Sequence, residues 1–374
     1  MMRYETIVIG SGIAGCSVSY FLDKLGDEVL VLDRSSIAGS GGSGSAGAFV
    51  SPKIGKGSPL QELTNRAYIF AKDFYSQNFP KYFHQTGVIR IPKDEADDEK
   101  FIDYEKFNSR YRRVSKDELS KLNISSDFDS FLFEEAGVCD APELCRAILS
   151  NIPHRQHRVK RLEYIDGYWH IDNMYVAKNI ILATGYENEL IDMRYMGVRG
   201  TWGSRGDYFS DLRLDVSMHK SISISANIDG IVKIGATHNK SKNPCMICDG
   251  EPLAQLEDMA SKMVDSSDFR LKQTFCGMRA GSKDYFPLVG GVIDVPKMFR
   301  EYPKITTGQR VKEPISKLDN LYILNGLGGR GFVFAPLMGE ILAEHIISKR
   351  DIPKEVNPDR LFLKWCRKSR DLER

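Results

Sequence analysis

Three glycines near the N-terminus constrain what this chain can fold into. An apolar run leads into Gly10, Gly12 and Gly15, spaced G-x-G-x-x-G, and a second apolar run ends at Asp33. In a strand–turn–helix unit the first glycine permits the tight turn, the second lets backbone approach a pyrophosphate, and the third lets the helix pack closely. The helix N-terminus favours phosphate, and an acid at this distance accepts hydrogen bonds from a ribose. The pattern predicts a dinucleotide site; the alternative is a glycine turn without a nucleotide.

Length and charge set the broad class of protein. At 374 residues the chain exceeds the size at which a single hydrophobic core stops growing, so we expect two domains. The formal net charge is +2. The chain as a whole is therefore not a general polyanion binder, and any contact with nucleic acid must be local.

Cysteine usage and apolar runs bear on the compartment. The seven cysteines are odd in number and scattered, and the first apolar run is already the first expected strand. We therefore expect free thiols and a cytoplasmic protein. We also expect no membrane association, because no stretch approaches the apolar length that spans a bilayer.

Two helices and an unusual loop are expected in the N-terminal part. Apolar periodicity predicts helices over 13–25 and 60–79. Residues 37–48 between them consist mainly of glycine, serine and alanine. A flexible linker is one interpretation. We favour a loop whose backbone passes close to a flat ligand, because the segment directly follows the second nucleotide strand.

Later segments alternate between sheet and helix patterns. The expected strands are 87–92, a meander of 159–164, 168–172 and 175–177, an Ala-Thr-Gly strand at 179–185, then 221–225, 230–235 and 320–326, and the expected later helices are 142–149 and 336–348. These elements predict an α/β chain in which a discontinuous Rossmann-like domain is combined with a mixed α+β substrate domain containing an antiparallel sheet. The predicted nucleotide-binding domain comprises 1–80, 136–200 and 318–374, and the predicted substrate domain comprises 81–135 and 201–317.

The order of these motifs resembles a known family. A dinucleotide turn, a meander before an Ala-Thr-Gly strand, and a C-terminal Gly-Gly-Arg-Gly-Phe turn at 328–332 are together similar to the FAD-dependent amine oxidases of the D-amino-acid oxidase and glycine oxidase superfamily. The resemblance covers essentially the whole chain. It implies an oxidoreductase that acts on a CH–NH group with FAD as its cofactor and the Rossmann-like domain as the FAD-binding domain. The residues assigned to FAD by the motif and the resemblance are Gly10, Gly12, Ile13, Ala14, Gly15, Asp33, Arg34, Ser45, Gly47, Ala48, Val159, Ala183, Thr184, Gly185, Gly329, Arg330, Gly331 and Phe332.

Within that superfamily, two stretches are most similar to the FAD domain of the MnmC family of bacterial tRNA wobble-uridine modification enzymes. They are residues 277–290 and 326–342. This resemblance implies oxidation of the carboxymethylaminomethyl group on uridine 34 of tRNA, which leaves aminomethyluridine, and it makes the tRNA anticodon region the partner. Bifunctional members carry a methyltransferase half ahead of the FAD domain, whereas the first strand here has nothing before it. We therefore expect any later methylation to be done by a separate methyltransferase.

Two arginines are the candidate catalytic residues. The arm to be oxidised is an N-substituted glycine, and a guanidinium fork fixes a carboxylate in two dimensions. Arg279 matches the residue that holds the substrate carboxylate in glycine oxidase-like enzymes, and Arg330 lies in the turn expected over the flavin. The alternatives are an ion pair between Arg279 and Asp284, and a purely flavin or helix contact for Arg330. No base is required, since an amine that has already lost its proton donates hydride directly and FAD supplies the reactive centre. We expect the helix from Pro336 to direct its N-terminus at the flavin, where charge develops.

Other features are ambiguous. Cys245 and Cys248 have metal-ligand spacing, but no second pair accompanies them, so we expect no metal. Basic runs at 111–113, 154–161 and 364–370 suit an RNA contact or are simply solvated charge. Two competing functions stay open. One is an oxidase of free glycine- or sarcosine-like amino acids, and the other is a non-catalytic flavin- or tRNA-binding protein.

Overall fold

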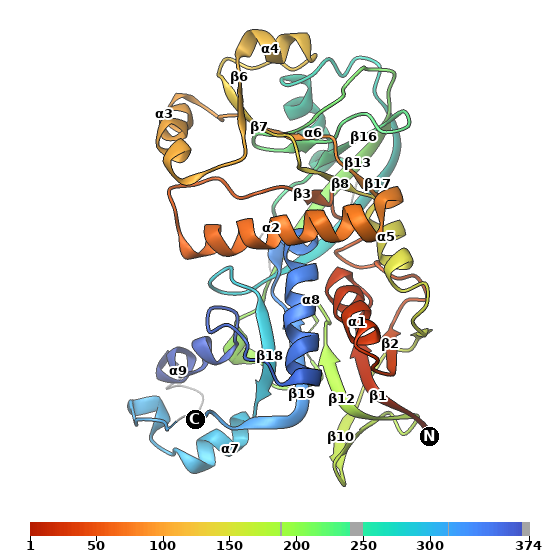
Figure 1. Cartoon of the computed structure of the whole chain (residues 1–374), viewed down its shortest axis with the longest axis vertical. Coiled ribbons are helices and arrows are strands. Elements are labelled where there is room, and N and C mark those ends of the chain that lie inside the picture. The colour runs from red at the N-terminus through yellow and green to blue at the C-terminus, as the bar shows by residue number, and fades with distance from the viewer. Residues whose placement is uncertain (188, 240–249, 313, 369–374) are drawn as a thin grey trace.

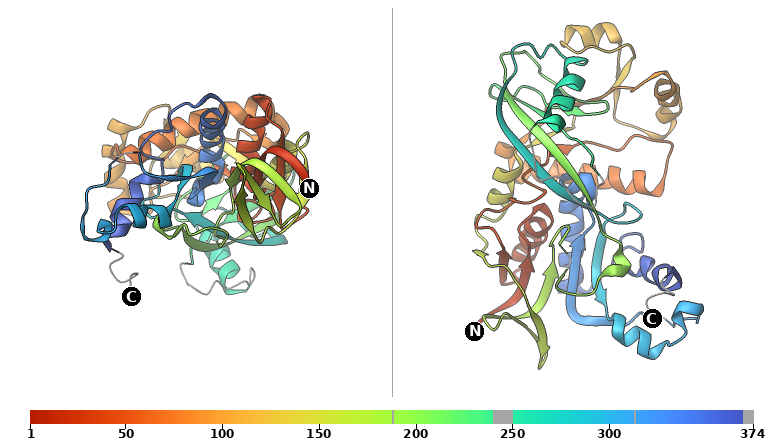
Figure 2. Two further views of the ribbon diagram at one scale, coloured as in Figure 1. Left: turned by 90° about the horizontal axis from the view of Figure 1, so that it is seen from below. Right: turned by 180° about the vertical axis from the view of Figure 1, so that it is seen from behind.

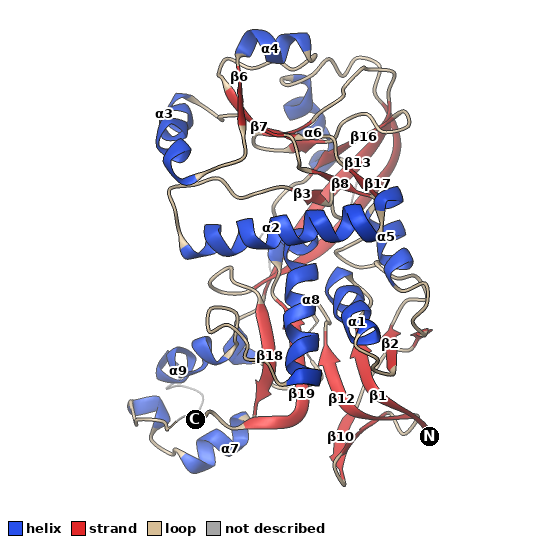
Figure 3. Cartoon of the chain, in the orientation of Figure 1, coloured by secondary structure: helices blue, strands red, loops and turns tan. Residues whose placement is uncertain are grey.

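The molecule is elongated, with one sheet toward each end. The computed structural model describes residues 1–187, 189–239, 250–312 and 314–368. Figure 1 shows the first sheet at the end that carries the N-terminus, the second sheet at the opposite end, and helix α2 (Pro59–Asn78) running across the middle. Helices and strands are mixed in both halves (Figure 3). The fold is therefore a mixed α/β architecture, as the sequence predicts.

The first sheet has eight strands around a parallel core. Its parallel pairs are β9–β2, β2–β1, β1–β12 and β12–β19, while β10, β11 and β18 are antiparallel to their neighbours. The strands are β1 (Met2–Ile9), β2 (Val29–Asp33), β9 (His154–Gln156), β10 (Leu162–Ile165), β11 (Tyr168–Ile171), β12 (Tyr175–Leu182), β18 (Leu288–Ile293) and β19 (Lys317–Asn325). This arrangement confirms the Rossmann-like sheet.

Both faces of the parallel core are buried. Val8 belongs to one apolar cluster, whereas Ile7 and Ile9 belong to another, as the alternation of side chains along a strand requires. The first cluster includes side chains from α1 (Ile13–Lys24), α2, α5 (Ala141–Ile148) and α8 (Gly331–Ser348), and the second includes α7 (Val295–Glu301) and α9 (Asp359–Lys368). Helices thus cover both faces, which explains why these strands read as continuous apolar runs.

The second sheet is largely antiparallel. Its order is β17-β13-β16-β15-β14-β5-β7-β6, and β5 and β14 form its parallel pair. The strands are β5 (Val88–Arg90), β6 (Arg112–Val114), β7 (Ser130–Phe133), β13 (Arg199–Phe209), β14 (Ser217–His219), β15 (Ser223–Ile224), β16 (Ile231–Gly235) and β17 (Arg270–Gly281). Three short strands, β3 (Phe49–Val50), β4 (Phe83–His84) and β8 (Gly137–Cys139), form a small third sheet. The remaining helices are α3 (Glu95–Tyr104), α4 (Lys116–Lys121) and α6 (Glu251–Ser261).

Strand β17 links the two ends of the molecule. Figure 2 shows the long strands of the second sheet reaching down toward the first. The last residue of β17, Gly281, forms a bridge with Leu327, just before the turn that leads into α8. The boundaries of the two domains stay a prediction. Within the segment 201–317, which was assigned to the substrate domain, strand β18 pairs with β19 in the first sheet.

Four expected elements differ from the structure. The strands expected at 175–177 and 179–185 are one strand, β12, whose first half pairs with β11 and whose second half pairs with β19. Strand β10 begins at Leu162, so Val159 lies before it. Helix α8 begins at Gly331, not at Pro336, and contains the proline as an internal residue.

We expected no stretch long and apolar enough to span a membrane. By the criteria of length and composition, that expectation is wrong. The segment Gly328–Ser348 meets both criteria, and 61% of its most apolar window is buried inside the molecule. It packs in the core between α1 and α2; a methyl group added at Gly339 would lie 2.9 Å from the backbone nitrogen of Val18. Burial against neighbouring helices accounts for its apolar composition.

The expectation of free thiols is confirmed for four cysteines. Cys16, Cys139, Cys145 and Cys366 are buried free thiols, and burial raises the pKa of Cys16, Cys139 and Cys366. The expectation is wrong for Cys276, which is disulfide-bonded. The Cys245–Cys248 pair lies outside the described residues.

Candidate active site

A cavity of about 1010 Å³ lies where the two sheets meet. Its wall contains the turn after β1, the loop after β2, the end of β12, the last residues of β17 and the turn before α8. The volume is at the upper end of the range for cofactor and small-molecule sites. The carboxyl ends of β1, β2 and β12 open onto it, the position at which open α/β sheets bind their ligands.

Two glycines of the first turn are required by close contacts. Gly10 has a φ of +110°, and a Cβ there would lie 2.3 Å from the carbonyl oxygen of Ala183. A Cβ at Gly15 would lie 1.9 Å from the carbonyl oxygen of Gly10. Neither position can accept a side chain without moving the strand or the helix. The turn therefore keeps the backbone of α1 tight against β1 and leaves the space in front of it free.

The carboxylate of Asp33 is fixed at the end of β2. Its Oδ2 accepts a hydrogen bond of 2.7 Å from the backbone N–H of Ser11, and its Oδ1 accepts one of 2.8 Å from the N–H of Ser35. A carboxylate offers about four acceptor positions, so two stay available for ribose hydroxyls. The Asp33 side chain is thus oriented before any ligand arrives.

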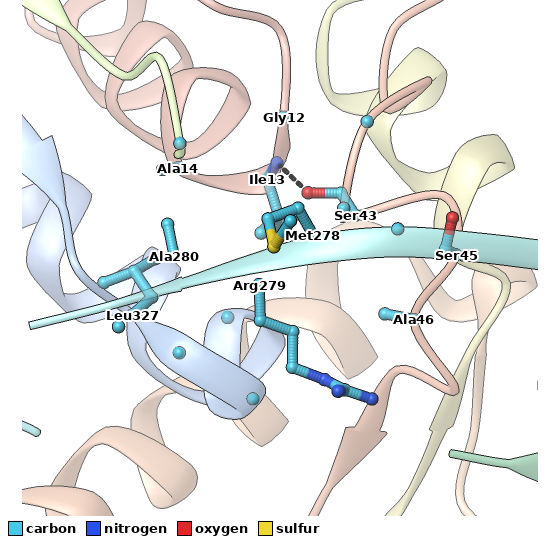
Figure 4. A pocket seen from close by; sticks show the side chains of 18 of the residues that line it. Gly12, Ile13, Ala14, Ser43, Ser45, Ala46, Met278, Arg279, Ala280 and Leu327 are labelled. Atoms are coloured by element: carbon cyan, nitrogen blue, oxygen red, sulfur yellow. Dashed lines mark hydrogen bonds between the residues drawn. The ribbon is translucent and has the colours of Figure 1, made fainter. Parts of the chain in front are cut away.

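The N-terminus of α1 opens onto the same cavity. Gly12 is the N-cap residue and offers no side chain to cap the helix. The backbone N–H of Ile13 donates 2.9 Å to the hydroxyl of Ser43, as Figure 4 shows, so this N–H is not free as the sequence suggests. The loop after β2 therefore closes over the helix N-terminus through one serine.

The structure brings nearly all of the sequence-predicted residues to one cavity. Gly15 is the exception, because it lies behind the wall against Gly10. The predicted residues that line the cavity are Gly10, Gly12, Ile13, Ala14, Asp33, Arg34, Ser45, Gly47, Ala48, Val159, Ala183, Thr184, Gly185, Arg279, Gly329, Arg330, Gly331 and Phe332.

The glycine- and serine-rich segment is a cavity wall and not a linker. A Cβ at Gly42 would lie 2.5 Å from the carbonyl oxygen of Met278, and the Ser45 hydroxyl donates 2.6 Å to the carbonyl oxygen of Cys276. The segment is thus clamped along β17, and its small residues permit that approach. The interpretation that backbone passes close to a ligand here is consistent with its place in the wall.

A buried arginine holds this loop from beneath. The Arg205 guanidinium pairs with Asp207 at 2.9 Å, lies 4.0 Å from the centre of the Phe275 ring, and donates to the carbonyl oxygen of Ala46. Sequence reasoning missed Arg205. Its guanidinium is buried and contacts a carboxylate, an aromatic ring and a backbone carbonyl, which is typical of an arginine with a structural role.

Arg279 projects into the cavity from β17. Figure 4 shows its side chain on the opposite side of the strand from Met278 and away from the Ile13–Ser43 bond. Its Nη1 donates 3.1 Å to the carbonyl oxygen of Thr237 and lies 3.4 Å from Nδ1 of His238. Burial lowers the pKa of the guanidinium. The alternative of an ion pair with Asp284 is wrong, because Asp284 instead pairs with Arg360 through two contacts of 2.9 Å.

Arg330 and two cations that were not predicted, Arg90 and Lys53, also line the cavity. Arg330 is the N-cap residue of α8, Arg90 is the last residue of β5, and Lys53 follows β3. Within the described ranges, the side chains of these three residues have no hydrogen bond or ion pair. His219 faces Arg90 in the β5–β14 register, and its Nδ1 is 2.7 Å from the Ser223 hydroxyl.

The electrostatics of these groups are mutually unfavourable. Burial and the neighbouring Arg330 lower the pKa of Arg90 to about 9, and burial lowers the pKa of Arg330 to about 10. Burial, Arg330 and Arg90 lower the pKa of Lys53 in turn. Burial and the same two arginines lower the pKa of His219 well below its ordinary value. Both arginines remain cationic at neutral pH, so this part of the cavity attracts anions.

The carboxylates of the described wall are confined to its nucleotide end, where the basic residues Arg34, Arg158 and Lys160 lie as well. Its carboxylates are Asp33, Glu187 and Glu189, which lie at the nucleotide end near β2 and after β12. Glu187 pairs there with Arg34. The part around Lys53, Arg90 and Arg330 contributes no carboxylate to the described wall. The cavity thus offers a ribose-binding acid at one end and positive charge without an ion-pair partner among the described residues at the other.

The basic run at 111–113 is less available than the sequence suggests. Arg112 pairs with Glu118 at 2.6 Å and Arg113 pairs with Glu105 at 2.5 Å, so the run at 111–113 is neutralised by neighbours. The run at 364–370 extends beyond the described residues. In the described part of the chain no group of three His, Cys, Asp or Glu side chains could hold a metal ion.

Comparison with protein families identifies the fold and its cofactor class. Residues 5–345 match the model of the DAO family, described as FAD dependent oxidoreductase. The chain belongs to this family. It is therefore an FAD-dependent oxidoreductase of the class that acts on CH–NH groups, and FAD is its cofactor.

Curated relatives carry a more specific name. The chain is 24% identical over 384 residues to the tRNA 5-methylaminomethyl-2-thiouridine biosynthesis bifunctional protein MnmC of Legionella pneumophila, with 96% of this chain and 57% of the relative covered. It is 24% identical over 370 residues to the MnmC protein of Marinobacter nauticus, with 91% and 55% covered. The chain thus spans a little over half of the length of these relatives.

Solved structures share the fold at low identity. Glycine oxidase from Bacillus cereus superposes with a TM-score of 0.76 at 18% identity, covering 93% of this chain and 96% of that chain. Iminodiacetate oxidase from Chelativorans sp. superposes with a TM-score of 0.75 at 18% identity, covering 95% and 99%. Both confirm the architecture derived above.

The residues present fit FAD. The glycine turn has the close contacts that exclude side chains from the pyrophosphate position, the Asp33 carboxylate is fixed with acceptor capacity to spare, and the cavity continues from there past β17. Gly10, Gly12 and Asp33 would hold the adenosine and pyrophosphate parts. The turn at 328–331 and the loop at 43–48 would then flank the ring system, since both line the same cavity.

Proposed function

We propose that this protein oxidises the carboxymethylaminomethyl group of wobble uridine 34 in tRNA and leaves an aminomethyl group. The observation that carries the proposal is the guanidinium of Arg279, half-buried in the same cavity as the FAD-binding turn and not paired to a carboxylate among the described residues. The MnmC relatives, which are named for tRNA modification, support the choice of substrate.

Arg279 would bind and orient the substrate carboxylate. Its Nη1 is anchored on the Thr237 carbonyl at 3.1 Å, which fixes the plane of the fork. A bidentate arginine–carboxylate contact restricts both position and rotation, so the methylene next to the nitrogen would be held in one place. FAD, when bound, supplies the acceptor for the two electrons that leave with the methylene hydride. Hydrolysis of the resulting C=N bond would release the carboxymethyl carbons as an oxo acid.

Positive charge in the cavity would serve the same reaction. Arg90 and Arg330 disfavour a protonated amine in their vicinity, and the reacting nitrogen needs a free lone pair. The described wall around them offers no carboxylate as a base, and the chemistry requires none. The amine would therefore lose its proton to solvent before oxidation.

The nucleosides of cellular tRNA test this proposal. Cells lacking the protein are expected to accumulate the carboxymethylaminomethyl nucleoside, and the wild-type chain should restore the normal composition. The Arg279→Met variant should not restore it, whereas Arg310→Met, an exposed arginine outside the cavity, should. Unchanged nucleosides in the deletion strain would exclude the proposed reaction.

Oxidation of free glycine- or sarcosine-like amino acids is the second candidate. The same Arg279 fork would bind the carboxylate of a small amino acid equally well, which favours this alternative at the level of the site. The rival of a non-catalytic flavin- or tRNA-binding protein is disfavoured, because the chain belongs to a family of FAD-dependent oxidoreductases. The cytoplasmic location and a separate methyltransferase that acts on the product stay predictions.

A further inference from the structure

The part of the cavity around Arg330 contains more positive charge than one carboxylate requires. An N-substituted glycine has one carboxylate, and Arg279 supplies a complete guanidinium fork for it. Lys53, Arg90 and Arg330 line the same cavity and come from three separate segments, namely the chain after β3, the end of β5 and the N-cap of α8. Convergence of three cations from distant parts of the sequence indicates a site and not a solvated surface run.

These three cations form a group separate from Arg279. Arg330 and Arg90 are among the causes that lower the pKa of Lys53, and Arg330 is among those that lower the pKa of Arg90, whereas burial is the cause that acts on Arg279. The Nη1 of Arg279 is also anchored on the Thr237 carbonyl oxygen at 3.1 Å. The cavity therefore holds two places where an anion would be stabilised.

Leaving like charges half-buried without a counter-ion is unfavourable for the free protein. Removing a charge from water costs several kcal/mol unless a partner repays it. The described residues provide no ion pair to Lys53, Arg90 or Arg330, although the Asp97 carboxylate acts on Arg90 from beyond ion-pair distance and raises its pKa. Strongly perturbed charges that face a cleft are typical of binding sites. A ligand anion would supply the missing partner.

We propose that Lys53, Arg90 and Arg330 form a second anion subsite, so that the preferred substrate carries two anionic groups, one held by Arg279 and the other by this group. The proposal rests on the proposed function in taking a carboxylate-bearing amine as the reacting group. The second anion is either a phosphate, as on a nucleotide, or a second carboxylate, as on a small dicarboxylic amine. In both cases the subsite determines specificity against glycine and sarcosine, which carry one carboxylate.

Three carboxylates that contain no amine test the subsite without turnover. Butyrate, glutarate and phosphonobutyrate share a three-carbon chain and carry one carboxylate, two carboxylates, or a carboxylate and a phosphonate. Their dissociation constants for the FAD-loaded protein can be measured by calorimetry at fixed salt. We expect the two dianions to bind at least roughly ten-fold more tightly than butyrate, the effect of one additional charge-assisted contact. The tighter of the two dianions identifies phosphate or carboxylate as the natural group.

Matched substitutions locate the effect. Lys53→Met and Arg90→Met should each lower the ratio between dianion and butyrate affinity, and Arg279→Met should weaken all three compounds. Lys354→Met removes an exposed cation outside the cavity wall and should leave the ratio as in wild type. Arg90→Lys keeps the charge and should retain most of the preference, which covers the case that Arg90→Met does not bind FAD.

Two results would overturn the proposal. One is a wild-type protein that binds all three compounds equally well. The other is a preference for dianions that survives both the Lys53 and the Arg90 substitutions. Neither result depends on tRNA, so failure of the proposed tRNA reaction and failure of the subsite are separate findings.

Discussion

The phenolic hydroxyl of Tyr75 on α2 donates a hydrogen bond of 3.0 Å to the carbonyl oxygen of Phe332 in the first turn of α8. That carbonyl would otherwise accept from the residue four positions later, which is Pro336 and has no N–H. The tyrosine thus supplies the donor that the proline lacks. Since Phe332 and Arg330 line the cavity, this bond also fixes the start of α8 next to the site.

Replacing Tyr75 by phenylalanine should therefore destabilise the protein more than loss of an ordinary tyrosine hydrogen bond. Tyr75 is fully buried, so Tyr75→Phe leaves a buried carbonyl without a donor, at a cost of about 1–3 kcal/mol in the free energy of unfolding. Tyr20→Phe on α1 is the matched control, because the hydroxyl of Tyr20 bonds Asn78 at an exposed position. Equal midpoints in urea denaturation for the two variants would contradict the assigned role of Tyr75.

Gly15→Ala should abolish FAD binding. The added methyl group would meet the carbonyl oxygen of Gly10 at 1.9 Å, and relieving that contact moves the turn that holds the pyrophosphate. Gly26, which follows the C-terminal end of α1, has a φ of +83° and open space around it. Gly26→Ala is therefore expected to cost about 1 kcal/mol of stability yet to purify with FAD. Full flavin content in the Gly15 variant would show that the turn does not hold the cofactor.

Arg205→Lys should weaken FAD binding, although Arg205 does not line the cavity. Lysine cannot keep both the Asp207 pair and the bond to the Ala46 carbonyl, so the loop over the ring system loses its support. We expect the dissociation constant to rise by about ten-fold or more, since hydrogen bonds to charged groups contribute about 1.5–3 kcal/mol. Arg199→Lys, an exposed arginine of the same strand, serves as the control. Identical FAD affinities in titrations of the two variants would exclude this supporting role.

Acid should weaken the contacts of the Asp140 carboxylate, which link the start of α5 to His84 in β4 and to Lys233 in β16. Burial raises the pKa of Asp140, but hydrogen bonds from His84 at 2.7 Å and Lys233 at 2.9 Å outweigh it and bring the pKa to about 2. Because this value lies below that of the unfolded chain, the stabilisation is complete above about pH 4 and is lost as the pH falls toward 2. The shift corresponds to about 2 kcal/mol.

Asp140→Asn is accordingly expected to lower stability at neutral pH and to flatten its decline between about pH 4 and 2. Asp192→Asn breaks a more exposed pair with Arg194 at 2.7 Å and should change stability by less than about 1 kcal/mol. Chemical denaturation at a series of pH values measures both. If the free energy of unfolding of the wild-type protein did not decrease as the pH is lowered from about 4 to 2, the role assigned to Asp140 would be refuted.

Local patterns predicted the strands, the glycine turn and the helix at the nucleotide end of the cavity. The glycine spacing and the acid at Asp33 are fixed by short-range geometry, and the same is true of α1, which the structure places at Ile13–Lys24. Helix α8 was misjudged because a proline normally marks the first turn of a helix. Here the missing bond is replaced by Tyr75, which lies far away in the sequence.

The second group of cations had no local signal. Arg90 is a single charge within an apolar strand, and Lys53 is one of two lysines in a short loop that also contains Gly55 and Gly57. Pairing of β5 with β14 places Arg90 opposite His219, and the start of α8 places Arg330 at the same cavity. Contacts of this kind are set by tertiary packing, so one sequence read by itself does not reveal them.

Anaerobic mixing of the FAD-loaded protein with tRNA tests the central claim most directly. We predict that tRNA carrying the carboxymethylaminomethyl group on its wobble uridine bleaches the flavin absorbance, that fully modified tRNA does not, and that the Arg279→Met variant stays oxidised with both. Bleaching by glycine or sarcosine with no response to the hypomodified tRNA would contradict the proposed function.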